Sequence, residues 1–114
     1  MMTKEMIDNA MKDCAKEVRE IYGDKLKEII LFGSCARGDF DSESDMDEMI
    51  LLDVSRDNIP TERRKIRTVI EKLDEKYDYE ILFSTVMRSY DEFNKYLKAS
   101  PFYGSVNREG IKYA

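Results

Sequence analysis

The first part of the chain has apolar residues at every third or fourth position, as on one face of an α-helix. Gly23 follows the last of them, so the pattern predicts a helix over residues 3–22. The apolar positions are Met6, Ile7, Ala10, Met11, Cys14, Val18, Ile21 and Tyr22. A run rich in Ile and Leu comes next and is closed by Gly33 and Ser34. This run predicts a buried strand over residues 26–32.

The rest of the chain alternates between helix and strand patterns. The predicted elements are a helical turn at residues 34–37, a strand at 46–54, a loop at 55–60, a helix at 61–76, a strand at 79–86, a helix from Ser89 to Leu97, and a short helix at 102–109. Ser89 and Glu92 form a capping box, which supports the start of the penultimate helix. Alternating strands and helices predict an α/β (α+β) layer fold.

Length and charge restrict the classes of protein that remain. The 114 residues allow a single domain, residues 1–114, with one core. The net charge of −5 argues against direct binding of nucleic acid, which requires clustered basic residues. The longest apolar runs have four residues, well short of the ~20 needed for a membrane span. The first 22 residues show no signal or transit pattern, so a cytoplasmic setting is expected, with Cys14 and Cys35 as free thiols.

The sequence contains no histidine. Ser-His and Cys-His catalysis and histidine-based zinc sites are therefore excluded. Carboxylates must supply acid, base and metal-ligand chemistry. Residues 39–48 hold six acidic side chains in ten positions. Among them, Asp45 and Asp47 stand two apart at the start of a predicted strand, so both project from one face about 6.6 Å apart along the backbone. Such a pair can bind Mg²⁺, a hard ion that prefers oxygen ligands.

The turn between the first strand and the helical turn has the features of a phosphate site. Gly33 lets a phosphate approach the backbone, and the amides at a helix start point outward as anion donors. The Ser34 hydroxyl and the Arg37 guanidinium are further candidate contacts. Together with Asp45 and Asp47, this turn predicts a site for a nucleoside triphosphate with Mg²⁺. Neither G-x-x-x-x-G-K-[ST] nor G-x-G-x-x-G occurs, which excludes a P-loop or a dinucleotide fold.

The segment Gly33-Ser34-Cys35-Ala36-Arg37-Gly38, followed by Ser44-Asp45-Met46-Asp47, resembles the signature of DNA polymerase β-type nucleotidyltransferases in their minimal form, the MNT domain. Residues 79–84, 101–103 and 107–110 are similar to later segments of small bacterial members. The resemblance implies a small mixed β-sheet covered by helices. It also implies that Asp45 and Asp47 bind two Mg²⁺ ions and that Gly33 and Ser34 hold the triphosphate of ATP.

The resemblance further implies a third carboxylate on the next strand. Asp78 and Glu80 both lie on one face of the predicted strand, and Glu80 is preferred because it directly precedes the apolar run that begins at Ile81. The sequence differs from the pattern of this family at Glu48, where similar proteins carry an apolar residue. Alternation places Glu48 opposite the site face, either in the core or exposed at the strand edge.

The implied activity is transfer of a nucleoside monophosphate, AMP from ATP, to an acceptor hydroxyl with release of pyrophosphate. Similar minimal domains act as antitoxins, as in MntA-like proteins of toxin–antitoxin systems, and pair with a HEPN ribonuclease toxin that some of them adenylylate on tyrosine. A short chain also suggests that a second subunit, in a homo- or hetero-oligomer, completes the pocket. Two alternatives stay open: a small-molecule transferase like the aminoglycoside-modifying relatives, and a non-catalytic module that neutralises its partner by contact.

Overall fold

The computed structural model describes residues 2–114, and its four strands form one mixed sheet in the order β3-β2-β1-β4. The strands are β1 (Leu26–Phe32), β2 (Met46–Leu52), β3 (Phe83–Ser89) and β4 (Ile111–Lys112). β1 pairs antiparallel with both β2 and β4, whereas β2 and β3 run parallel. The predicted small mixed sheet is confirmed.

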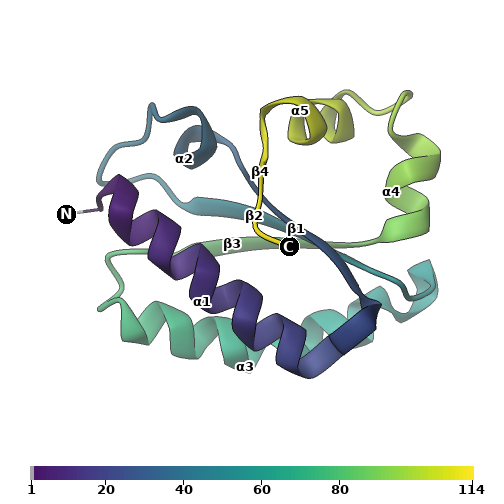
Figure 1. Ribbon diagram of the computed structural model, residues 1–114, viewed down its shortest axis with the longest axis horizontal. Helices are drawn as coiled ribbons and strands as arrows, with labels where there is room; N and C mark the ends of the chain where they lie inside the picture. Colours follow the sequence, from purple (N-terminus) through teal and green to yellow (C-terminus); the bar gives the residue numbers. More distant parts are fainter. Residues whose placement is uncertain (1) are drawn as a thin grey trace.

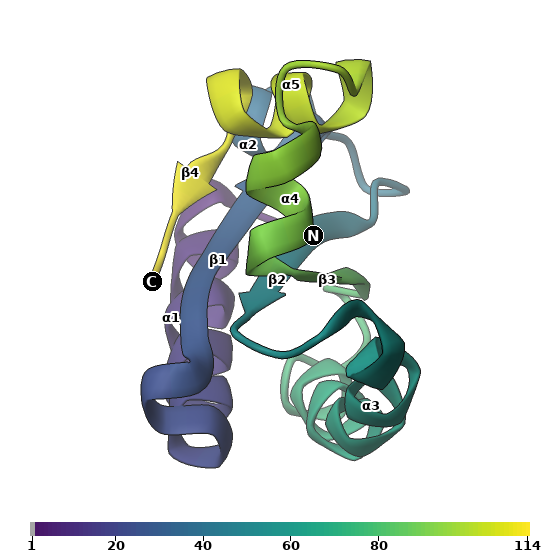
Figure 2. The same cartoon turned by 90° about the vertical axis from the view of Figure 1, so that its right-hand side faces the viewer.

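Helices cover both faces of this sheet (Figures 1 and 2). They are α1 (Lys4–Tyr22), α2 (Ser34–Arg37), α3 (Ile59–Lys76), α4 (Tyr90–Tyr96) and α5 (Pro101–Glu109), with short 3-10 turns η1 (Gly23–Lys25) and η2 (Arg56–Asn58). α1 and α3 lie on one face, and α4 and α5 lie on the other, with α2 on the same side as α5. Between residues 2 and 114, none of the helices has both the length and the apolar character that a membrane crossing requires.

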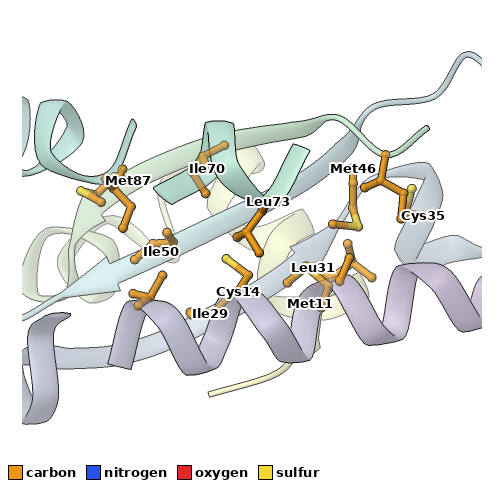
Figure 3. Close-up of a cluster of buried hydrophobic side chains, with 14 of the residues drawn as sticks. Met11, Cys14, Ile29, Leu31, Cys35, Met46, Ile50, Ile70, Leu73 and Met87 are labelled. Atoms are coloured by element: carbon orange, nitrogen blue, oxygen red, sulfur yellow. The ribbon is translucent and has the colours of Figure 1, made fainter. Parts of the chain in front are cut away.

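The core lies on both sides of the sheet because successive residues of a strand point to opposite faces. Along β2, Met46 and Ile50 pack with α1 and α3, whereas Met49 and Leu51 pack with α4 and α5. Figure 3 shows the larger cluster, in which side chains of α1 and α3 meet those of β1 and β2. Residue 47 therefore faces α4 and α5, on the opposite side from this larger cluster.

The start of α3 differs from its prediction. The helix begins at Ile59, two residues before the predicted start, and Pro60 lies in its first turn. Pro60 was interpreted as loop punctuation, but a proline is well tolerated in a first turn, where its missing N–H has no helical partner. β2 is also two residues shorter than predicted and ends at Leu52.

The third strand was placed too early. β3 begins at Phe83, so Asp78 and Glu80 lie in the preceding turn and not on a strand. Asp78 and Tyr79 adopt positive φ angles of 55° and 58°, and the Glu80 N–H donates to the Tyr77 carbonyl at 3.0 Å. These contacts close the end of α3. No glycine marks the left-handed positions, so the sequence pattern favoured a strand that started at residue 79.

The C-terminal part of the chain contains the helices α4 and α5 and the short strand β4. α4 and α5 begin after Ser89 and Ser100, whose hydroxyls accept from backbone N–H groups three residues ahead. This confirms the predicted start of the helix at Ser89, whereas α5 begins at Pro101, one residue before its predicted start. β4 was not predicted, because a two-residue strand is too short to show any periodicity. Gly110 joins α5 to β4, and a Cβ there would overlap Ile30 and the Val106 carbonyl, so this junction is packed closely against β1.

Glu48 is fully buried on the α1 and α3 side of β2, as alternation predicted. Its carboxylate accepts hydrogen bonds from the Thr85 hydroxyl at 2.9 Å and from the Cys14 thiol at 3.2 Å. Burial raises the pKa of Glu48 to about 7, although both hydrogen bonds oppose the rise. The departure from an apolar residue is thus compensated by two polar partners from α1 and β3.

Glu48 should make the stability of the protein fall as the pH rises. Its folded-state pKa lies above its ordinary value of 4.5, so the unfolded chain ionises first, and this ionisation lowers the free energy of the unfolded state relative to the folded state between pH 4.5 and about 7. The full effect is at most about 3 kcal/mol, present as stability below pH 4.5 and lost by about pH 7. Urea unfolding of wild type and Glu48→Gln in metal-free buffer measures it. The variant should show a flatter pH profile and match or exceed wild type at pH 8.

The control is Glu43→Gln, which removes an exposed carboxylate from the loop before β2. It should reproduce the wild-type pH profile. Parallel profiles for wild type and Glu48→Gln would contradict the assignment of this pH dependence to Glu48.

Candidate active site

The candidate site lies where β2 begins, on the face covered by α5. Asp47 pairs with Phe32 of antiparallel β1 and with Ser84 of parallel β3. Residues paired directly across strands point to the same face, so these three side chains form one row across the sheet. We call Phe32, Asp47 and Ser84 the site row. The Ser84 hydroxyl hydrogen-bonds to the Asp47 carboxylate, and the ring of Phe32 meets Phe102 of α5 edge-on at 5.6 Å.

Gly33 makes room for Asp47. Gly33 has φ 72° and ψ −156°, a combination that is essentially restricted to glycine. A Cβ at this position would overlap Oδ2 of Asp47. The tight turn between β1 and α2 therefore brings the backbone directly against the carboxylate. Gly33 therefore lies beside Asp47, and the joint phosphate and metal site, with Ser34 as a member, stays a prediction.

The two aspartates act on one another. Burial raises the pKa of Asp47, and the charge of Asp45 raises it further, whereas the Ser84 hydrogen bond and the Arg37 charge oppose the rise. Asp45 is exposed just before β2, and its backbone carbonyl accepts from the Cys35 thiol at 3.6 Å. The structure thus brings Asp45, Asp47 and Arg37 into one electrostatic neighbourhood. A cation bound there would relieve the repulsion between the two carboxylates.

Arg37 is placed by residues that the sequence analysis did not connect with it. Its guanidinium lies 3.4 Å from Oδ2 of Asp39 and 3.7 Å from Oε2 of Glu109 at the end of α5. The contact with Glu109 spans 72 positions, and no local pattern could have indicated it. Both ion pairs are half-exposed, so each contributes little to stability and leaves Arg37 able to move toward an anion.

Cys35 lies inside the motif but has the character of a core residue. Its side chain is buried, and burial together with the charge of Asp47 raises the pKa of its thiol to about 11. A thiol of this kind is a poor nucleophile at neutral pH. Cys14 is also a free, buried thiol, so both cysteines are free as predicted.

The residues present fit a divalent cation that is bound partly by the protein and partly by the phosphates of a nucleotide. Asp45 and Asp47 supply hard carboxylate oxygen atoms that interact electrostatically with one another, and Mg²⁺ commonly uses one or two carboxylates together with substrate phosphates. Within residues 2–114, no group of three or more His, Cys, Asp and Glu side chains is arranged to hold a metal. The assignment of Glu80, or alternatively Asp78, as a third carboxylate ligand stays a prediction. So does the number of Mg²⁺ ions.

Residues 11–107 match the family described as nucleotidyltransferase domain, which covers most of the chain. The chain belongs to this family, and the resemblance seen in the glycine-serine turn and the Asp-x-Asp spacing is confirmed.

Two relatives come from the archaeon Methanocaldococcus jannaschii. One carries the provisional name protein adenylyltransferase MJ0141 and is 38% identical over 104 residues, which cover 90% of this chain and 93% of the relative. The other carries the provisional name protein adenylyltransferase MJ0604 and is 34% identical over 103 residues, with the same two shares. The similarity therefore extends over almost the full length of each protein.

Proposed function

We propose that this nucleotidyltransferase moves AMP from ATP to a hydroxyl group on another protein, with Mg²⁺ as the divalent cation. The observation that carries the proposal is the position of Asp47, which lies against Gly33 and in the same electrostatic neighbourhood as Asp45 and Arg37. This supports a pair of carboxylates acting beside a turn suited to phosphates. The names of the two relatives support a protein as the acceptor.

In the proposed reaction the acceptor oxygen attacks the α-phosphorus of ATP. The new O–P bond forms as the bond between the α-phosphorus and the bridging oxygen breaks, pyrophosphate leaves with that electron pair, and the acceptor proton passes to solvent. Mg²⁺ supplies charge neutralisation and lowers the pKa of the acceptor hydroxyl. Asp45 and Asp47 hold the cation, while Gly33, Ser34 and Arg37 orient the phosphates. The contribution of the protein is then mainly positioning and electrostatic stabilisation.

The acceptor we propose is a tyrosine of a HEPN-type toxin, with this protein as its antitoxin in a hetero-oligomeric complex. The basis is the resemblance to MNT antitoxins. We place the reaction in the cytoplasm, where ATP is available and thiols such as Cys14 and Cys35 stay reduced. A small-molecule acceptor and contact-only neutralisation are the competing outcomes of the test below.

The test is transfer of label from α-labelled ATP to a co-expressed partner protein. We expect a labelled partner that gains the mass of one AMP at a tyrosine, with pyrophosphate released in equal amount. A second reaction uses ATP labelled at the γ-phosphate and should leave the partner unlabelled. Label on an aminoglycoside instead of protein would favour the small-molecule activity. Neutralisation of the partner without any label would favour a contact-only module.

Nucleotide binding should depend on Asp45. Calorimetry with Mg²⁺ and ATP should show binding to the wild-type protein that weakens at least tenfold in Asp45→Ala, because one of the two carboxylate ligands is lost. The matched control is Asp41→Ala, which removes an aspartate from the same acidic loop but not from the pair. Its affinity should stay within about twofold of wild type. Equal ATP affinity in wild type and Asp45→Ala would count against the site.

A further inference from the structure

The side chain that faces Asp47 from β3 is a hydroxyl and not an acid. The parallel register pairs Asp47 with Ser84, and the hydroxyl of Ser84 hydrogen-bonds to the Asp47 carboxylate. Ser84 is half-buried, so this contact is shielded from bulk water. Gly33 crowds the same carboxylate from the end of β1. Asp47 is therefore fixed from both neighbouring strands.

The β3 position in the site row is where a third strand-borne ligand would stand. The two acids of the turn before β3, Asp78 and Glu80, precede the strand and its pairing with β2. Through the described part of the chain, residues 2–114, no set of three His, Cys, Asp or Glu side chains converges on a metal position. The charge that attracts a cation at the row thus comes from Asp45 and Asp47, and the nearby Arg37 reduces it.

We propose that Ser84, at the β3 position of the site row, orients Asp47 and adds no charge to the metal site, so that the protein binds its divalent cation together with a nucleotide's phosphates and only weakly without them. The inference rests on the proposed function. The two carboxylates of Asp45 and Asp47 leave much of the octahedral shell of a Mg²⁺-like ion to other oxygen atoms, and triphosphate oxygens can supply them. Ser84 is a positioning residue, because it acts by orienting Asp47.

The experiment titrates Mn²⁺ by electron paramagnetic resonance, with and without α,β-methylene-ATP, which cannot transfer its AMP. For wild type we expect affinity for Mn²⁺ at least tenfold higher when the analogue is present. Ser84→Asp should raise the affinity for Mn²⁺ alone at least tenfold, because it adds a carboxylate to the site row. Ser42→Asp adds the same charge to the acidic loop, outside the row, and should change the affinity less than threefold.

Two more variants keep the test informative if Ser84→Asp fails to fold. Ser84→Ala should leave the affinity for Mn²⁺ alone within twofold but weaken the complex with the analogue about three- to tenfold, and Ser84→Thr should restore it. Glu80→Gln should leave both affinities within twofold. Tight binding of Mn²⁺ alone to wild type, or a tenfold loss in Glu80→Gln, would overturn the inference and favour a strong third carboxylate ligand.

The outcome separates this inference from the proposed function. If wild type binds the Mn²⁺–analogue complex but Ser84→Asp gains nothing, the role of Ser84 is wrong and the nucleotide site stands. If no protein variant binds the analogue with Mn²⁺, both the inference and the proposed nucleotide site fail.

Discussion

Asp47→Asn should abolish AMP transfer, with a loss of about 10³-fold or more. The substitution keeps the shape of the side chain but removes the negative charge that holds the divalent cation, and electrostatic stabilisation is a large part of catalysis in such a site. The fold should survive. Burial already disfavours the charged form of Asp47, as its raised pKa shows, so the neutral amide should not lower the melting temperature.

The control for this variant is Asp53→Asn. Asp53 is exposed and directly follows the other end of β2. The same substitution is therefore made at a position outside the site row. It should keep wild-type transfer. The measurement is the initial rate of partner labelling at saturating ATP. If Asp47→Asn retained more than a tenth of the wild-type rate, Asp47 would not be a metal-binding catalytic residue.

Gly33→Ala should reduce both stability and transfer. The φ and ψ angles of Gly33 are strained for any other residue, and the added methyl group would overlap the Asp47 carboxylate. Strain and overlap together should lower the free energy of unfolding by about 3 kcal/mol. Transfer by the fraction that stays folded should fall roughly 100-fold, because displacement of a catalytic group by about 1 Å can cost that much.

Gly23→Ala separates the two causes. Gly23 also has a positive φ of 53°, but no atom lies within 4 Å of a Cβ added there, and it follows α1 at the far end of β1 from the site. It should lose stability through backbone strain and keep the transfer rate of the folded protein. Equal rates for folded Gly33→Ala and Gly23→Ala would refute the idea that Gly33 positions Asp47.

Most of the fold followed from local patterns in the sequence. The stripe of α1, the buried run of β1 and the Ser89 cap each depend on neighbouring residues, and each is confirmed. The error at β3 arose where the local pattern was ambiguous. Residues 79–82 have the composition of a strand, but contacts with the end of α3 hold Asp78 and Tyr79 in left-handed conformations. These are local hydrogen bonds at a helix end, and because no glycine marks the left-handed positions, the sequence pattern carries no signal for them.

The part of the candidate site that could be predicted consists of residues close together in the sequence. Gly33, Ser34, Asp45 and Asp47 lie within fifteen positions, and the structure brings Asp47 against Gly33 as expected. The partners that come from far along the chain were not predictable. Ser84 reaches Asp47 through the register of a parallel pair, and Glu109 reaches Arg37 through the docking of α5.

The parallel pairing of β2 with β3 also implies an order in which the parts of the site form during folding. β1 and β2 are neighbours along the chain, whereas β3 joins β2 only after the whole of α3 has been crossed. Contacts that close a longer loop form more slowly. We expect an emerging chain to carry its paired aspartates in an antiparallel ribbon before Ser84 arrives to fix Asp47. Formation of the complete site would then wait for the pairing of β3 with β2.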